Sequence, residues 1–299
     1  MELRQLRTFA TVAELLSFNR AAKALGYAQS TVSAQVQGLE ESLNAPLFAR
    51  LGRRVELTPV GERLLEYARR MIDLEEEARG AAGGEVRGRL CVAVAGSVAL
   101  AQGPALVRGF GERFPGADLE VRVCPARGLA EELSSGGADV ALTLGAEGKG
   151  ADLVEEELAR WRVCLAVGRG HALAGRLGVP TSALAGETLF LPGSEPGVAR
   201  PVLAALAEAG VEPARTVEMG ALGALAACVA AGEGVGVMPE PLLGSGGAGC
   251  AVGMERLVAV QWAERAPEVP VRLVRHAQAH ASSLAEGFME AARRVLGGA

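Results

Sequence analysis

Residues 21–65 read AAKALGYAQSTVSAQVQGLEESLNAPLFARLGRRVELTPVGERLL, and this stretch decides the fold of the N-terminal part of the chain. Its first five residues favour a helix, and Gly26 follows at the position where a left-handed residue commonly ends one. From residue 29 to residue 43, apolar side chains at helical spacing define one face, and small or amide side chains cover the other. The apolar face consists of Val32, Val36, Leu39 and Leu43. The stretch therefore predicts two helices joined by a short turn.

Another helix is predicted in front of this pair. Its apolar residues recur at helical spacing, and they are Leu3, Leu6, Phe9, Ala10, Ala13 and Leu16. The tripeptide Ser17-Phe18-Asn19 then interrupts the pattern, and Asn19 is expected to cap the second helix because its side chain can accept a backbone hydrogen bond there.

Two helices with a short turn between them form a helix-turn-helix, whose second helix enters the major groove of DNA. Hydroxyl and amide groups on that helix can bind the donors and acceptors of base edges. The candidate contacts are Gln29, Ser30, Thr31, Ser33 and Gln37. The alternative is an ordinary helical hairpin with a solvated polar face.

A basic hairpin is predicted directly after the third helix. Residues 46–59 read PLFARLGRRVELTP, with short β-prone runs on either side of Gly52 and Arg53. Arginines at such a wing can contact phosphate or enter the minor groove, whereas the alternative is a solvated turn. The candidates are Arg50, Arg53 and Arg54.

A long helix should follow, because Thr58 is a good N-cap and Pro59 suits the first helical position. Its apolar residues alternate spacings of four and three, which predicts a two-stranded coiled coil with a second copy of the chain. These residues are Val60, Leu64, Tyr67, Met71, Leu74 and Ala78. Packing against its own domain is the alternative. Glycines 83, 84 and 88 then predict a hinge over residues 83–88.

From Arg89 onward the pattern is α/β, with apolar strands that alternate with helices. We expect two similar lobes in tandem, like a periplasmic binding protein, with a ligand cleft between them at the carboxyl ends of the strands. Lobe I should comprise about residues 89–161 and 267–299, and lobe II about residues 162–266. The expected units are thus a winged helix-turn-helix over 1–58, a dimerising helix over 59–82, the hinge, and an effector-binding domain over 89–299.

The charge is distributed unevenly between these units. Residues 1–58 carry seven basic and five acidic side chains, a net charge of +2, whereas the whole chain has a net charge of −5. A basic module on an acidic body is compatible with contact to phosphate by that module alone.

The sequence has no segment that would direct it to a membrane. No apolar run approaches the length of a membrane span, and the charged start MELRQLRTFA is unlike a signal peptide. We therefore expect a cytoplasmic location and no membrane partner.

Other functional classes find little support in the sequence. An enzyme on the α/β body would need a motif such as GxSxG, a P-loop or HExxH, and none is present. The glycine-rich run 232–236 precedes a predicted strand rather than following one, and His276 and His280 have no third metal ligand nearby. The five cysteines are scattered, which favours buried thiols over a redox pair or a zinc site. A solute-binding protein that does not contact DNA is the remaining alternative, and the winged module argues against it.

Residues 21–65 resemble the N-terminal signature of the LysR-type transcriptional regulators. The matching positions are Phe18, Ala21, Ala22, Leu25, Gln29, Val32, Ser33, Leu39, Glu40, Leu47, Phe48, Arg50, Arg53, Leu57, Thr58 and Gly61. The architecture matches to the C-terminus, through Pro104, Phe110, Pro115, Leu133, Asp139, His171, Leu173, Ala174 and the stretch from Val229 to Pro239. Two departures are Ala28, where a capping Ser is usual, and Ala34, where a longer polar side chain often contacts DNA.

The resemblance implies a sequence-specific transcriptional regulator, not an enzyme, that needs no cofactor or metal. It would bind double-stranded promoter DNA as a homodimer or homotetramer, take a small-molecule effector such as a small organic acid between its lobes, and contact RNA polymerase if it activates transcription. Gln29, Ser33 and Arg53 fall on the DNA-contacting positions of the family. Candidate effector contacts are Ser97, Val98, Arg127, Thr143 and Ser194. Ser97 is expected at a helix N-terminus, where free N–H groups attract anions.

Overall fold

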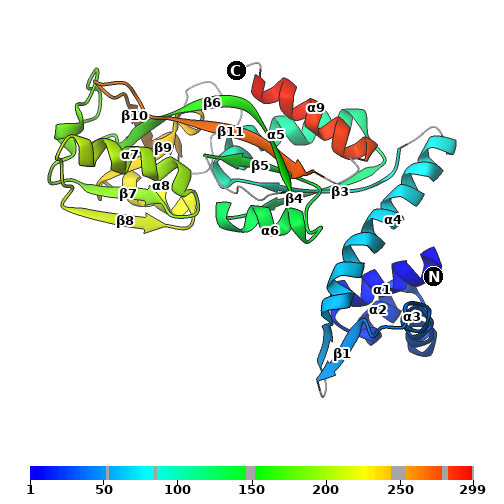
Figure 1. Ribbon diagram of the computed structural model, residues 1–299. Helices are drawn as coiled ribbons and strands as arrows, with labels where there is room; N and C mark the ends of the chain where they lie inside the picture. Colours follow the sequence, from blue (N-terminus) through cyan, green and yellow to red (C-terminus); the bar gives the residue numbers. More distant parts are fainter. Residues whose placement is uncertain (52–53, 84–85, 146–151, 244–253, 278–281, 298–299) are drawn as a thin grey trace.

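The computed structural model describes residues 1–51, 54–83, 86–145, 152–243, 254–277 and 282–297. The chain begins with three helices, α1 (Leu3–Leu15), α2 (Phe18–Leu25) and α3 (Gln29–Leu43). The antiparallel strands β1 (Phe48–Leu51) and β2 (Arg54–Leu57) follow them. In Figure 1 this N-terminal module packs at one end of the long helix α4 (Pro59–Gly83).

The turn between α1 and α2 differs from the sequence prediction at one residue. The N-cap of α2 is Ser17, whose hydroxyl accepts a hydrogen bond from the Arg20 N–H (3.3 Å), so the prediction of Asn19 as the cap is wrong. Phe18 is the first helical residue, and its ring packs against Phe48 with 5.6 Å between the centroids. This packing accounts for the earlier start of the helix, because the aromatic side chain has to face the core. Gly26 ends α2 in the left-handed conformation, as predicted.

The module has its own core beneath α3. Phe9 and Phe48 have ring centroids 5.4 Å apart, and Leu6, Leu39 and Leu47 are buried with them. The Glu40 carboxylate fixes the start of the hairpin, since it accepts hydrogen bonds from the N–H groups of Leu47 (2.7 Å) and Phe48 (3.2 Å). The α3 helix is thereby held on the hairpin by both apolar and polar contacts.

Helix α4 begins as predicted. Thr58 Oγ1 accepts a hydrogen bond from the Gly61 N–H (3.0 Å) and donates one to the Pro46 carbonyl (2.7 Å). Of the predicted apolar stripe, Val60 and Leu64 pack against the core of the N-terminal module. Farther along, Tyr67, Met71 and Leu74 are 54%, 37% and 48% exposed in the described structure. The helix is 25 residues long, one residue past its predicted end, and Gly84 lies outside the described residues.

Lobe I is a sheet with helices on both faces. Its strands β3 (Gly88–Val94), β4 (Ala117–Val123) and β5 (Val140–Leu144) are parallel. The helices α5 (Gly96–Arg113) and α9 (Ser283–Gly297) pack against each other through Phe110 and Phe288. The shorter helix α6 (Leu129–Ser134) contacts the other face.

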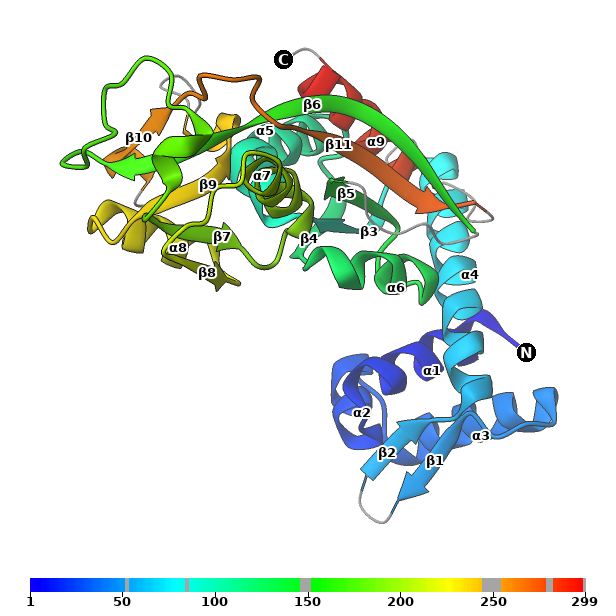
Figure 2. The ribbon, with the colours of Figure 1, turned by 60° about the vertical axis from the view of Figure 1, so that its left-hand side comes forward.

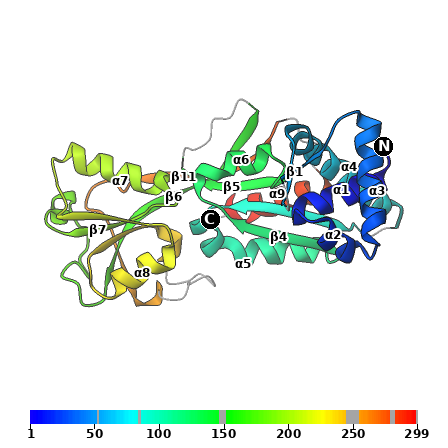
Figure 3. The ribbon, with the colours of Figure 1, turned by 90° about the horizontal axis from the view of Figure 1, so that it is seen from below.

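Lobe II repeats this plan with β7 (Thr188–Pro192), α7 (Pro196–Glu208), β8 (Arg215–Met219), α8 (Leu222–Ala230), β9 (Val235–Pro239) and β10 (Leu257–Val260). Short 3-10 helices complete the chain at η1 (Ala126–Gly128), η2 (Thr181–Leu184), η3 (Glu240–Leu242) and η4 (Met254–Arg256). Figure 3 shows lobe II at one end, lobe I in the middle and the N-terminal module at the other end. None of the helices in the described ranges has an apolar stretch long enough to cross a membrane.

Two strands connect the lobes, β6 (Leu153–Gly168) and β11 (Glu268–His276), and Figure 2 shows both passing over the top of the molecule. The strand order is β4-β3-β5-β11-β6-β9-β7-β8, with β10 paired to β6. The first part of β6 pairs with β11 and its last part pairs with β9 and β10, so one strand belongs to both lobes.

The sequence predicted only the last part of β6 as a strand. It predicted neither β8 nor β10. The missed part of β6 carries three consecutive glutamates, 155 to 157, which hide the strand periodicity. Arginines of neighbouring elements neutralise them. Arg293 binds Glu156 at 2.7 Å, and Arg272 lies 3.6 Å from Glu155 and 3.7 Å from Glu157.

The uncapped start of α3 generates a prediction about stability. Ala28 is the N-cap, with extended backbone angles (φ −68°, ψ 146°) and no capping side chain. Ala28→Ser should stabilise α3 by about 0.5–2 kcal/mol, because a serine hydroxyl there can accept a hydrogen bond from the first turn. Hydrogen exchange of the α3 amides in the full chain should slow accordingly. Ala34→Ser, in the exposed middle of the same helix, is the control and should give no protection; equal protection in both variants would contradict the capping argument.

Candidate nucleic-acid interface and effector cleft

The outer face of α3 carries the predicted base-contacting residues. Gln29, Ser30 and Gln37 are exposed, and Thr31 and Ser33 are half-buried, while the opposite face is buried in the core. The Gln29 amide nitrogen donates to the Ser33 hydroxyl (2.9 Å), so these two side chains lie together one turn apart. This face offers both donors and acceptors to a base edge.

The hairpin projects from the end of the module that faces away from the lobes (Figures 1 and 2). Arg50 lies in β1 opposite Val55, and Arg54 lies in β2 opposite Leu51. Arg53, the third predicted arginine, lies outside the described residues. Strand pairing thus places the backbone of two predicted arginines on adjacent strands of a wing.

The effector candidates occupy the carboxyl ends of three strands. Ser97 is in the first turn of α5, just after β3; Thr143 is in β5; and Ser194 follows β7. The Ala126 N–H donates to the Ser194 carbonyl (3.2 Å), which joins η1 of lobe I to the β7–α7 loop of lobe II. Three of the predicted residues therefore belong to the region where the two lobes meet.

Two further candidates are placed differently. Val98 has no exposed surface and is part of the main hydrophobic core, so it does not line an accessible site in this arrangement. Arg127, in η1, is exposed. Thr143 is 3% exposed, and its hydroxyl makes no hydrogen bond within the part of the chain that the structure describes. A buried hydroxyl without a partner is uncommon in a folded protein.

The residue that sequence reasoning missed at this site is Glu195. Its carboxylate accepts hydrogen bonds from the Ser97 N–H (2.6 Å) and the Ser97 hydroxyl (2.5 Å), and both residues are buried. The donors expected to meet an effector anion are thus engaged by a side chain from the other lobe. A glutamate between a strand and the proline that begins a helix is common on protein surfaces, so nothing in the local sequence marked this one as buried.

The lobes approach each other closely beside this contact. A Cβ atom on Gly145 would lie 2.6 Å from the Gly197 Cα, so no side chain fits at either position without movement of the backbone. A Cβ on Gly96 would lie 3.4 Å from both the Glu195 carboxylate and Leu222. The two glycines at 145 and 197 therefore permit the direct contact of the lobes.

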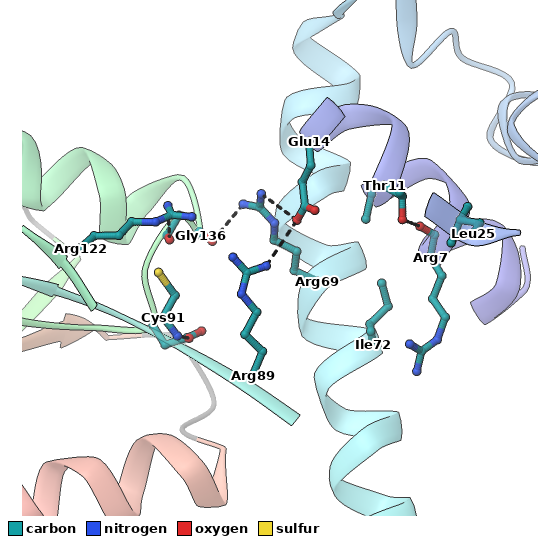
Figure 4. A pocket seen from close by; sticks show the side chains of 13 residues that line it. Arg7, Thr11, Glu14, Leu25, Arg69, Ile72, Arg89, Cys91, Arg122 and Gly136 are labelled. Carbon is teal, nitrogen blue, oxygen red and sulfur yellow. Dashed lines mark hydrogen bonds and ion pairs between the residues drawn. The ribbon is translucent and has the colours of Figure 1, made fainter. Parts of the chain in front are cut away.

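A cavity of about 290 Å³ lies between α1, α4 and lobe I (Figure 4). Arg69 of α4 donates to the Gly136 carbonyl of lobe I (3.0 Å). Glu14 of α1 lies 3.6 Å from Arg69 and 3.9 Å from Arg89 of β3. These polar contacts tie the N-terminal module and α4 to lobe I, and no motif in the sequence predicted them.

The described residues contain no group of three or more His, Cys, Asp and Glu side chains that could hold a metal ion. His276 ends β11, and His280 lies outside the described residues. The glycine-rich run 232–236 enters β9 from its amino end, as the sequence indicated, which is the wrong side for a phosphate cradle.

Comparison with known proteins identifies both parts of the chain. Residues 3–62 match the family described as "Bacterial regulatory helix-turn-helix protein, lysR family", and residues 83–297 match "LysR substrate binding domain". The HTH-type transcriptional regulator TfdS of Cupriavidus pinatubonensis is 32% identical over an alignment of 304 positions that covers 99% of each chain. The uncharacterized HTH-type transcriptional regulator YwqM of Bacillus subtilis is 34% identical over 245 residues, 80% of this chain and 83% of YwqM.

Solved structures show the same fold. A full-length OxyR variant from Pseudomonas aeruginosa has a TM-score of 0.73 at 23% identity, covering 99% of this chain and 94% of OxyR. Full-length CbnR complexed with its target DNA has a TM-score of 0.64 at 28% identity, covering 99% of this chain and all of CbnR. From the helix-turn-helix to the two-lobed domain, this chain belongs to the LysR family of DNA-binding transcriptional regulators with an effector-binding domain.

Proposed function

We propose that this protein regulates transcription as a homodimer that binds promoter DNA through α3 and the β1–β2 hairpin. The observation that carries the proposal is the polar outer face of α3, exposed on a module whose other side is buried against a core. Gln29, Ser30, Thr31, Ser33 and Gln37 would contact base edges or phosphates, and Arg50, Arg53 and Arg54 would contact phosphate or the minor groove. The similar protein CbnR has been crystallised with its target DNA, which supports DNA binding by this chain.

The proposed units are a DNA-binding domain over 1–58, a dimerising helix over 59–82, a hinge over 83–88 and an effector-binding domain over 89–299. The exposed stripe of Tyr67, Met71 and Leu74 would pair with the same stripe of a second copy, and such dimers would associate further into a tetramer. A twofold pair presents two recognition helices to a palindromic site. The protein would act in the cytoplasm, where promoter DNA is found, and has no enzymatic role in this proposal.

A small effector would bind between the lobes, at the ends of β3, β5 and β7. A ligand that prefers one lobe arrangement shifts the population towards it. Through Arg69, Glu14 and Gly136 the change would reach α4 and the DNA-binding domain, altering the spacing of the paired modules and, in an activator, the contact with RNA polymerase.

Peroxide sensing is the function named for some relatives. A probable hydrogen peroxide-inducible genes activator of Streptomyces viridosporus is 35% identical over 246 residues, 80% of this chain and 77% of that protein. A peroxide-reactive cysteine needs a low pKa and access to solvent. Here burial raises the pKa of the Cys91 thiol to about 11 and that of the Cys164 thiol to about 12. Burial also raises the pKa of Cys124, so these thiols do not favour a peroxide sensor.

The DNA-binding role predicts a loss of affinity in a gel shift on the upstream intergenic DNA of the gene. Ser33→Ala should weaken specific binding by roughly 5–100-fold, the equivalent of ~1–3 kcal/mol for one base contact. Arg53→Ala should weaken specific and random DNA alike and reduce the slope of log affinity against log salt by about one. Ser42→Ala, exposed at the far end of α3, is the matched control. If Ser33→Ala and Ser42→Ala bind as the wild type does, α3 does not read this DNA.

The proposed dimer predicts a change of mass in solution. Met71→Glu places a charge in the middle of the apolar stripe and should raise the dimer dissociation constant by at least about tenfold, because the carboxylate would be desolvated. Met71→Leu keeps the stripe apolar and should leave the dimer intact. Analytical ultracentrifugation distinguishes monomer from dimer for each variant. A Met71→Glu chain that dimerises like the wild type would place the interface elsewhere.

The raised thiol pKa values predict slow alkylation. At pH 8 the native chain should react with iodoacetamide more slowly than the urea-unfolded chain, by about 100-fold at Cys91 and about 1,000-fold at Cys164, since each unit by which the pKa rises lowers the thiolate fraction tenfold. Mass spectrometry of tryptic peptides measures both rates. Rapid alkylation of either native thiol, or its oxidation by dilute peroxide, would restore the redox interpretation.

A further inference from the structure

Glu195 connects the two lobes through a pair of short hydrogen bonds. It lies in lobe II, between β7 and α7, and its two carboxylate oxygens accept from the N–H and the hydroxyl of Ser97 in lobe I. Ser97 has no exposed surface and Glu195 is 1% exposed. The carboxylate is therefore shielded from solvent at the contact between the lobes.

This carboxylate does not serve its own helix. Glu195 is the N-cap of α7, yet its side chain makes no capping hydrogen bond there, and the next residue is Pro196, which has no N–H. It extends instead to the first turn of α5, an 18-residue helix. The N-terminus of a helix attracts negative charge through its free N–H groups and its dipole. Glu195 thus occupies the place that would otherwise suit an anion from solution.

The surroundings leave little room for a second anion. The first-turn glycine of α5, Gly96, is packed between the Glu195 carboxylate and Leu222, and Gly145 contacts Gly197 directly. A ligand carboxylate would also have to compete for the two Ser97 donors that Glu195 already engages. Among the described residues, the polar group that remains at the neighbouring strand end is the Thr143 hydroxyl, on β5 next to β3.

We infer that Glu195 is a specificity-determining residue: it fills the anion position at Ser97 with a carboxylate of the chain itself, so that the effector carries no carboxylate or phosphate group at this position. The part of the effector that lies at this position is then uncharged or cationic, and the buried Thr143 hydroxyl is a contact for it. The inference rests on the proposed effector site between the lobes. It replaces the expectation of a small organic acid, which assumed that the donors of Ser97 were open to a ligand.

Removal of the carboxylate tests the inference, with thermal unfolding of the full chain followed by the fluorescence of Trp161 and Trp262, both buried in the effector domain. Glu195→Ala should lower Tm and should then be rescued by acetate, with a saturable rise of roughly 2–4 °C. Acetamide, which is uncharged and of similar shape, and chloride at equal ionic strength should not rescue it. Glu195→Ala combined with Ser97→Ala should respond less to acetate, because one of the two donors is lost.

The wild-type chain provides a second test that does not depend on the folding of the variant. Acetate, succinate and benzoate should give it no saturable rise in Tm beyond the chloride control. A saturable rise that Ser97→Ala weakens would overturn the inference, and so would a Glu195→Ala chain that responds equally to acetate and acetamide. None of these measurements involves DNA. If the wild-type chain does not bind DNA in the gel shift, that result counts against the proposed regulator. The role of Glu195 is decided separately, by the unfolding experiments.

Discussion

A hydrogen-bond donor buried at the junction of two lobes has no access to water and needs an acceptor within the protein. The arrangement of the effector domain depends on which group supplies that acceptor. The N–H and hydroxyl of Ser97 would each carry a desolvation cost if left unpaired. Glu195 satisfies both, and it does so from the opposite lobe. The pairing is therefore possible only while the lobes are in contact, which makes their separation costly unless water or a ligand takes over the same donors.

The backbone that connects the two lobes also favours the arrangement in which they are in contact. Because β6 runs through both lobes and β11 pairs along its first part, the lobes are joined by a continuous strand as well as by the segment that leads into β11. Changes of closure must then arise from bending of these strands and from loss of the contacts beside them. The glycines at 145 and 197 place backbone against backbone, so even one methyl group on either residue would move the lobes apart.

The parts of the molecule that the sequence predicted are those governed by local pattern. The limits of α3, the left-handed Gly26 and the Thr58 cap follow from apolar spacing and cap chemistry, which act over a few residues. The first half of β6 and the contact of Glu195 depend instead on residues far away in the chain. Three glutamates become tolerable in a strand only when Arg272 and Arg293 lie beside them, and Glu195 becomes buried only when Ser97, 98 positions earlier, faces it.

The contact between the two lobes and the junction of lobe I with the DNA-binding domain differ in strength. At the junction with the DNA-binding domain, Arg69, Arg89 and Glu14 are 30%, 50% and 42% exposed, and exposed ion pairs contribute only about 0.2–1 kcal/mol each. The contact of Glu195 with Ser97 is buried, and breaking it leaves two donors unpaired away from water, which makes it the more costly of the two to break. If an effector prefers one arrangement of the lobes roughly tenfold, the corresponding ~1.4 kcal/mol exceeds the contribution of any single exposed pair at this junction.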